Sequence, residues 1–377
     1  MDFNLTEERG LLRDMLQKFL GEKYGHEERR KLIASGKAYD AGIYAEMAEL
    51  GVLGAMFSEE DGGLGGAGFD IAVVFEELGR AGVIEPILGN AVLAGSLIAV
   101  LGSDSQKELI GSVIAGEILL AFAHAEPASR YDLNHVTALA KTDGGQITLN
   151  GTKAHVLNGA QAGMLVVSAR EAGADFDDTG ISLFLVPSDA KGVTIVDHPN
   201  VDGTSAATIR LENVVVDEGT RLGASGEAFG AIEAAVARAT LAVSAEALGA
   251  MEAAKALTID YLKERKQFGI AIGKFQALQH RMADVLIEVE QARSAVINLA
   301  GHLDAPRALR ERHVSATKNL IGRASALVGE EAVQMHGGIG MTDEYALSHF
   351  VRRMVMIDHL FGDVDHHLER FISLNAA

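Results

Sequence analysis

A long apolar seam in the C-terminal half constrains the fold of this chain most. Apolar residues recur every third or fourth position from Phe275 to Leu303, which keeps them on one side of a helix for about eight turns. Helical patterns also cover residues 228–264, 308–334 and 344–372, so the region predicts a four-helix bundle. The seam residues are Phe275, Leu278, Met282, Val285, Val289, Ala292, Val296, Leu299 and Leu303.

The rest of the chain changes period twice. A stripe from Leu12 to Leu20 and the stretches at about 39–53, 68–82 and 86–116 are helical. In the middle region the period becomes that of strands: Ile147 and Leu149 alternate with polar residues before Asn150-Gly151, which we expect to be a turn. Residues 165–167, 181–186 and 209–211 also read as strands. The prediction is an α+β protein with an N-terminal all-α domain (1–119), a mostly antiparallel β-barrel or sandwich domain (120–225) and the bundle (226–377).

Composition limits the classes of molecule that the protein is expected to bind. A net charge of -19 repels nucleic acid and anionic membranes, so an anionic ligand must be met by locally placed Arg or Lys. The chain has no Cys, and no apolar run approaches the roughly 18 residues that span a bilayer. The stretch from Met1 to Glu8 is acidic, unlike a secretory signal. We therefore expect a soluble, cytoplasmic protein of two or three packed units.

Two local motifs have simpler explanations than a ligand site. Gly63 to Gly68 fits a G-x-G-x-x-G pattern, but helical sequence rather than a strand precedes it, which favours an inter-helix loop. Asp363, Asp365, His366 and His367, with His359 nearby, suggest a metal site. Adjacent histidines point about 100° apart on a helix, however, so helix capping and polar side chains that face solvent are favoured and no metal is expected.

Two stretches carry the strongest functional signal. A helix that runs through Tyr261 and ends by Gly269 delivers Arg265, whose planar guanidinium can bind phosphate oxygens bidentately. The stretch from Gln334 to Gly340 pairs a polar amide with glycines that let backbone approach a nucleotide. Together they indicate a site for a polyanionic nucleotide.

In order and spacing, these stretches resemble the two flavin-contacting segments of the acyl-CoA dehydrogenase family. The resemblance covers the whole chain, including Glu59–Gly63, Ala125–Pro127 and Asn150–Lys153. It implies an FAD-dependent oxidoreductase, as in fatty acid or steroid side-chain catabolism. In this family a carboxylate removes the α-proton of an acyl-CoA, and the β-hydride passes to a flavin that an electron-transfer flavoprotein reoxidises. The cofactor residues it implies are Arg265, Phe268, Gln276, Gln334, Gly337 and Gly338.

The catalytic positions depart from the family. Where many members have a Glu before a Gly-Thr pair, this chain has Phe361. Other members take the base from the helix after the β domain, but residues 235–240 contain neither Asp nor Glu. The catalytic base is therefore unknown, with Glu233 and Asp363 as weak alternatives.

The β domain departs from the family as well. The family's Thr-Glu-Pro-x-x-Gly-Ser becomes residues 125–131, and its Trp-Ile-Thr-Asn becomes residues 155–158, so the hydroxyls and the indole that would line the flavin are missing. Arg130, Tyr131 and Arg238 are weak candidates for substrate contact, Arg130 with an acidic acyl tail.

The residues that would bind the nucleotide are thus present, whereas the residue types expected for the base and for the isoalloxazine pocket are missing. This pattern resembles the small-subunit type of acyl-CoA dehydrogenase, notably that for pimeloyl-CoA, and the half-site subunits of heteromeric steroid acyl-CoA dehydrogenases. We expect a heterotetramer with a base-bearing paralogue. The alternatives are a self-sufficient homo-oligomeric dehydrogenase with a relocated base and a non-catalytic assembly subunit.

Overall fold

The computed structural model describes residues 5–376, so the first four residues of the acidic N-terminal stretch lie outside it. The predicted order of helices, then strands, then helices is confirmed. The chain forms two compact units, one made of residues 5–31, 67–83 and 240–376 and the other of Leu32–Gly66 and Ile84–Ala239. These limits do not follow the division at 119 and 225, which remains a prediction.

The first unit is helical. The predicted N-terminal stripe lies on its first helix, where Leu16 and Leu20 are buried. Its elements are α1 (Glu7–Lys23), the start of α2 (His26–Ala34), α4 (Gly68–Ala81), most of α7 (Phe229–Glu264), β9 (Lys266–Gln267), β10 (Ile270–Ala271), η5 (Ile272–Lys274), α8 (Gln276–Ala300), α9 (Arg307–His336), η6 (Gly337–Met341), α10 (Leu347–His359) and α11 (Val364–Ala376).

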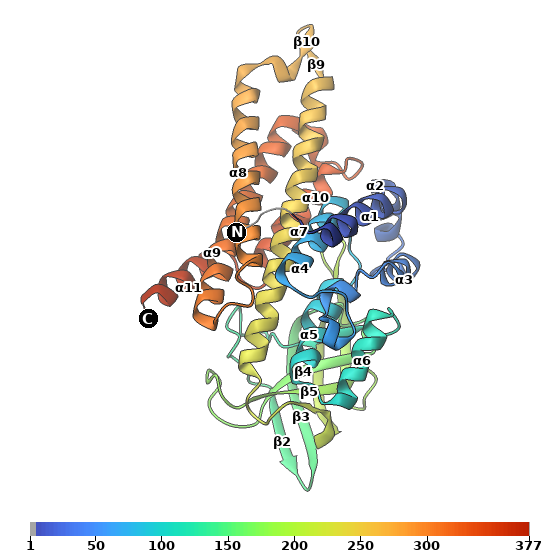
Figure 1. Ribbon diagram of the computed structural model, residues 1–377, viewed down its shortest axis with the longest axis vertical. Coiled ribbons are helices and arrows are strands. Elements are labelled where there is room, and N and C mark those ends of the chain that lie inside the picture. Colours follow the sequence, from blue (N-terminus) through green and yellow to red (C-terminus); the bar gives the residue numbers. More distant parts are fainter. Residues whose placement is uncertain (1–4, 377) are drawn as a thin grey trace. The chain divides into compact units, whose positions relative to one another are not determined.

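The predicted seam lies on α8. Its members from Met282 to Leu299 are buried, as the period of the pattern requires. Helices α8 and α9 pack along one another, and the β9–β10 hairpin extends beyond the ends of α7 and α8 (Figure 1).

Glycines set the contact between α4 and α7. A Cβ on Gly79 would collide with the carbonyl oxygen of Glu246, and one on Gly249 would collide with that of Glu76. The two backbones therefore touch directly at this crossing, which no larger residue permits.

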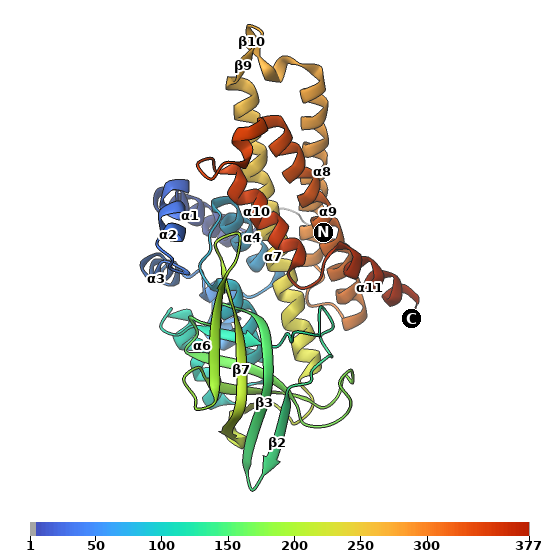
Figure 2. The ribbon, with the colours of Figure 1, turned by 180° about the vertical axis from the view of Figure 1, so that it is seen from behind.

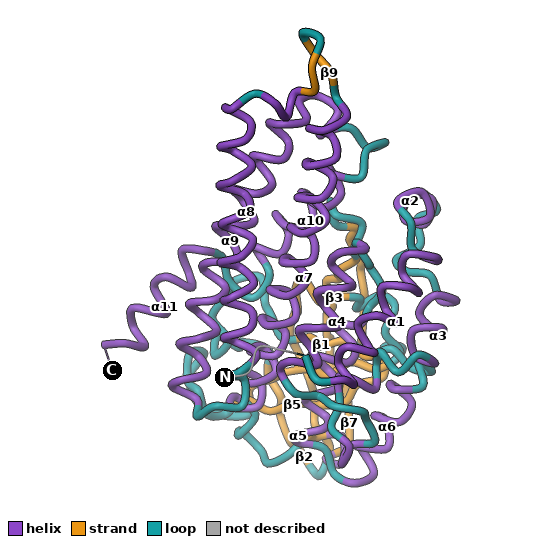
Figure 3. The backbone as a smooth tube through the Cα atoms, turned by 45° about the horizontal axis from the view of Figure 1, so that its top comes forward, coloured by secondary structure: helices purple, strands orange, loops and turns teal. Residues whose placement is uncertain are grey.

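The predicted helix over 344–372 is wrong as a single element. It consists of α10 and α11, which a non-helical link at residues 360–363 separates (Figure 3). Phe361 has φ 60 and Gly362 has φ 116, both outside the helical region. A non-glycine residue at positive φ is held there by its surroundings, which the helical period does not reveal.

The second unit combines short helices with a sheet. Gly62 to Ala67 form a loop between η2 and α4, as expected for the glycine-rich motif. The predicted helical stretch 86–116 is interrupted, and its first part is a π-helix. The elements are α3 (Ala41–Glu49), η1 (Gly54–Met56), η2 (Glu59–Asp61), η3 (Leu88–Gly95), α5 (Ser96–Leu101), α6 (Asp104–Ile114), β1 (Leu120–Ala123), β2 (Leu139–Asp143), β3 (Gln146–Leu157), β4 (Met164–Arg170), β5 (Ile181–Pro187), β6 (Val193–Pro199), β7 (Ser205–Asp217), η4 (Glu218–Thr220) and β8 (Arg221–Leu222).

The sheet has the order β6-β7-β3-β2-β4-β5-β8, with β1 added beside β4. Most pairs are antiparallel, as predicted; β1 with β4 and the single pair between β2 and β4 are parallel. The long strands β3 and β7 lie side by side (Figure 2). Apolar side chains such as Leu149, Val167, Phe184 and Ile209 form the core of this unit.

The turn predicted at Asn150-Gly151 is wrong. Both residues lie within β3, where the register with β7 shifts between Leu149 and Gly151. The Asn150 side chain accepts a hydrogen bond from the backbone N–H of Asn213 at 2.8 Å, so it serves a bulge rather than a turn. The β2–β3 turn lies at Gly144-Gly145, with φ 59 and φ 86.

A buried ion pair joins two of the motifs in the second unit. Lys153 Nζ lies 2.7 Å from Glu126 Oε1 and also donates to the carbonyl of His124 and the hydroxyl of Ser168. Burial raises the pKa of Glu126, but the Lys153 ammonium and hydrogen bonds from Thr137 and Ala138 outweigh it and bring the pKa to about 2. Glu126 is therefore a structural anion in the β core, not a free base.

One described helix, α7, is long and apolar enough by composition to cross a membrane. Of its most apolar window, 89% is buried within the fold. A helix that is apolar on all sides is also typical of a protein core.

We expect Gly249→Ala to destabilise the protein by about 1–3 kcal/mol, because the methyl group would force α4 and α7 apart. Gly230→Ala on the same helix is the matched control, since nothing lies within 4 Å of its added Cβ. The control should leave stability unchanged or raise it by roughly 0.4–1 kcal/mol. Urea unfolding measures both, and equal midpoints for the two variants would contradict the close crossing.

Glu126→Gln should cost about 3–5 kcal/mol, because it leaves the Lys153 ammonium buried without its counter-charge. The double variant Glu126→Gln, Lys153→Met should be more stable than the single one. Because the folded pKa of Glu126 is lowered, its stabilisation is complete above pH 4.5 and lost as pH falls toward about 2. Unfolding free energies measured from pH 7 to pH 3 test this, and an unchanged pH slope in the single variant would contradict it.

Candidate functional site

The first predicted nucleotide stretch forms an exposed arm. Helix α7 ends at Glu264, Arg265 follows, and the β9–β10 hairpin turns at Phe268 and Gly269. Phe268 has φ 52 and is 92% exposed, with its ring edge-on to Phe275 at 6.3 Å. A large aromatic ring with so little cover is suited to contact another molecule.

Three of the predicted cofactor residues keep their polar groups uncommitted. Arg265, Gln276 and Gln334 are exposed, and their side chains make no hydrogen bond or ion pair with any of residues 5–376. A guanidinium and two amides therefore remain available for phosphate or adenosine.

The second stretch lies beside the first. The ring of His336 stacks on Tyr261 of α7 at a centroid distance of 4.5 Å, and Tyr345 lies on it at 5.2 Å. Gln334 precedes this buried ring by two residues, and Gly337 and Gly338 follow it directly. The fold thus brings Tyr261 of the first stretch into contact with His336 of the second, although the two are 75 positions apart in the sequence.

A shallow groove accompanies these residues. Gln334 and Gly337 line it together with Val333, Met341 and Val351, and its volume is about 400 Å³. Gly337 has φ 67, and an added Cβ on Gly338 would meet nothing within 4 Å, so the backbone is open to a ligand. Uncommitted donors on both stretches, the exposed Phe268 ring and the groove at Gln334 and Gly337 fit the phosphate and adenosine portion of FAD.

The usual base position contains no carboxylate. Phe361 lies half-buried in the link between α10 and α11. Hydrogen bonds from two buried side chains hold the backbone around it. Buried Lys318 donates to the carbonyls of Asp358 at 2.8 Å and Gly362 at 2.7 Å, while His367 Nε2 donates to the carbonyl of Phe361 at 3.0 Å. Burial lowers the pKa of Lys318 to about 8. The phenyl ring cannot accept a proton, so this position cannot perform the family's proton abstraction.

The two weak base candidates lie at different places in the fold. Asp363 Oδ1 accepts a hydrogen bond from the backbone N–H of His366 at 2.9 Å and so caps α11. Glu233 lies on the part of α7 in the second unit and is only 2% exposed. Among the residues described, no group of three or more His, Asp or Glu side chains is arranged to hold a metal ion.

The predicted substrate residues belong to the second unit. Arg238 donates to the backbone carbonyls of Met56 and Gly66, each at 2.9 Å, and so fixes the loop before α4. Arg130 is exposed at φ 47, and Tyr131 beside it is half-buried. A role of these three residues in substrate binding stays a prediction.

Sequence reasoning gave no role to His336 or Lys318. A signal for the first was present: Val328, Ala332 and His336 follow one another at four-residue steps, so the histidine falls on the buried face of α9. The lysine carried none, because its partners are backbone carbonyls.

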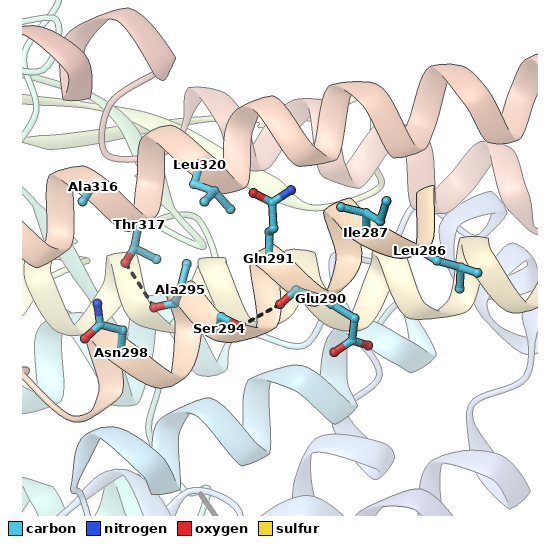
Figure 4. Close-up of a pocket in the computed structure, with 10 residues that line it drawn as sticks. All are labelled: Leu286, Ile287, Glu290, Gln291, Ser294, Ala295, Asn298, Ala316, Thr317 and Leu320. Atoms are coloured by element: carbon cyan, nitrogen blue, oxygen red, sulfur yellow. Dashed lines mark hydrogen bonds between the residues drawn. The ribbon is translucent and has the colours of Figure 1, made fainter. Parts of the chain in front are cut away.

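A second surface feature lies along the bundle. A groove of about 750 Å³ separates the outer faces of α8 and α9 (Figure 4). Leu286 and Ile287, which are 42% and 57% exposed, stand at one end of it, and only Glu290 among its lining residues is charged. The remaining lining residues are Gln291, Ser294, Ala295, Asn298, Ala316, Thr317 and Leu320.

Comparison with known proteins agrees with this architecture. The N-terminal, middle and C-terminal domain models of acyl-CoA dehydrogenase match residues 6–117, 121–214 and 226–370. The chain is 30% identical over 369 residues to the short-chain specific acyl-CoA dehydrogenase of Megasphaera elsdenii, covering 93% of this chain and 94% of that protein.

Solved structures agree as well. The butyryl-CoA dehydrogenase of Megasphaera elsdenii matches all of both chains, with a TM-score of 0.92 and 26% identity. A variant of the Tcur3481-Tcur3483 steroid ACAD matches over 98% of each chain, with a TM-score of 0.87 and 29% identity. This chain therefore belongs to the acyl-CoA dehydrogenase family of FAD-dependent oxidoreductases.

Proposed function

We propose that this chain is a small-subunit type of acyl-CoA dehydrogenase that supplies the nucleotide-binding half of an FAD site to a base-bearing paralogue. One contrast carries the proposal: Arg265, Gln276 and Gln334 are uncommitted at the bundle end, while Phe361 occupies the usual base position. A chain that can hold the nucleotide but cannot remove the α-proton gains a function when another chain provides the base.

Each of these residues would have its own role in binding FAD. Arg265 would bind the pyrophosphate, Gln276 and Gln334 would hydrogen-bond the nucleotide, and Gly337 and Gly338 would allow its close approach. Phe268 would cover it from the hairpin. When bound, FAD supplies the acceptor for the hydride from the β-carbon of the acyl-CoA. The partner's carboxylate would take the α-proton.

The surface of α8 supports a partner chain. The exposed arm with Phe268 leads directly into this helix, and the weakly charged groove begins on the same helix at Leu286. A paralogue that receives the arm can continue along α8 and cover the groove. The 29% identity to a steroid ACAD named for two proteins, Tcur3481 and Tcur3483, also favours a heteromer. We expect it to act in the cytoplasm, with an electron-transfer flavoprotein as acceptor.

Two alternatives have less support. A self-sufficient homo-oligomer would need a relocated base, yet neither Asp363 nor Glu233 occupies the position of Phe361, and Asp363 caps α11. A non-catalytic assembly subunit would not require uncommitted donors around Phe268.

Arg265→Ala should lower the flavin bound by the assembly of this chain with its base-bearing paralogue several-fold, because it removes the one cation expected on the pyrophosphate. Arg210→Ala is the control, since Arg210 is also exposed and also lacks a side-chain partner among residues 5–376. Flavin absorbance per chain measures the effect.

The same measurement separates the alternatives. If the chain alone binds one FAD and oxidises an acyl-CoA, and Glu233→Gln or Asp363→Asn abolishes flavin reduction, it is a self-sufficient enzyme. If Arg265→Ala leaves both flavin content and activity of the assembly unchanged, the chain is a non-catalytic subunit.

Ile287→Glu should weaken assembly with the paralogue, because it introduces an unpaired charge into a contact that excludes water. Val100→Glu is the matched control: Val100 is 67% exposed on α5 and is not among the residues that line the groove. Size-exclusion chromatography with light scattering reports the fraction assembled, and an equal loss in both variants would argue against docking on α8.

A further inference from the structure

Three aromatic rings connect the two nucleotide stretches. His336 is 4% exposed, its ring stacks on Tyr261 with an interplanar angle of 26°, and Tyr345 lies against it at 52°. Tyr261 precedes Arg265 by one helical turn, and its stack on His336 joins this end of α7 to α9. Tyr345 follows the glycine-rich segment 337–340.

Hydrogen bonds fix the state of the ring. Nδ1 lies 2.8 Å from the carbonyl oxygen of Ala332, which can only accept, so Nδ1 carries the proton. Nε2 lies 3.2 Å from the hydroxyl oxygen of Tyr345. Burial lowers the pKa of His336, and backbone hydrogen bonds with Ala332 and Leu257 oppose this only in part, so the neutral ring is favoured.

We propose that His336 is a positioning residue that holds the Arg265 end of α7 and the Gln334–Gly338 segment in the mutual arrangement that binds the nucleotide. This inference rests on the proposed function of the same site. The ring acts through its two neighbours: the stack fixes the end of α7, and the hydrogen bond to Tyr345 fixes the far side of the glycine segment. A histidine that only fills the core would affect stability without changing the affinity for FAD.

The test is a titration of the flavin-free assembly of this chain and its paralogue with FAD, followed by flavin fluorescence. His336→Ala, which loses the stack and the hydrogen bond, should raise the Kd by about tenfold, as residues coupled to a site without contacting the ligand can. His336→Phe keeps a ring between the tyrosines and should recover part of the affinity. Tyr345→Phe removes only the hydroxyl and should cause a smaller loss than His336→Ala.

Val328→Ala is the stability control, because Val328 is fully buried two turns earlier on α9. It should lower Tm without changing the Kd. If His336→Ala and His336→Phe lower Tm but keep the wild-type Kd, the positioning role is overturned. Should the alanine variant fail to fold, the two phenylalanine variants decide alone, and wild-type affinity in both overturns the role. Arg265→Ala separates the two proposals: if it also binds FAD like the wild type, the proposed function itself fails.

Discussion

The structure of the bundle unit depends on the burial of α7. This helix is apolar enough to cross a membrane, and 89% of its most apolar window is covered by protein. Such cover requires close neighbours, and Gly79 and Gly249 let α4 approach to backbone contact. Because the body of α7 is held so firmly, its last turn is a fixed support for Tyr261 and for the arm that begins at Arg265.

The candidate site combines rigid support with uncommitted polar groups. Three buried charged side chains elsewhere have partners within the fold: Glu126 pairs with Lys153, and Lys318 donates to two carbonyls. Arg265, Gln276 and Gln334, by contrast, make no side-chain bond within the described chain. This guanidinium and these two amides are therefore available to a ligand or partner rather than part of the hydrogen bonding within the fold. The base position is the opposite, a fixed backbone with an inert side chain.

Much of the fold could be predicted because it follows from local periodicity. The three- and four-residue steps from Phe275 to Leu303 require a helix with one buried side, and the alternation around Ile147 requires a strand. The errors occurred where tertiary contacts override local preference. Asn150-Gly151 has the composition of a turn, but pairing on both sides keeps it within β3. The helix predicted over 344–372 breaks at Phe361 because Lys318 and His367 bond its backbone.

The family, the order of the elements and the residue types available for a nucleotide follow from residue identities and their spacing along the chain. Which polar groups already have partners within the fold depends on the tertiary contacts. Glu126 became half of a buried ion pair and Asp363 a helix cap, whereas the polar groups of Arg265 and Gln334 remained unused on two stretches that meet where Tyr261 stacks on His336. Whether a polar group has a partner depends on which atoms lie within about 3 Å of it in space, and distance along the chain does not contain that information.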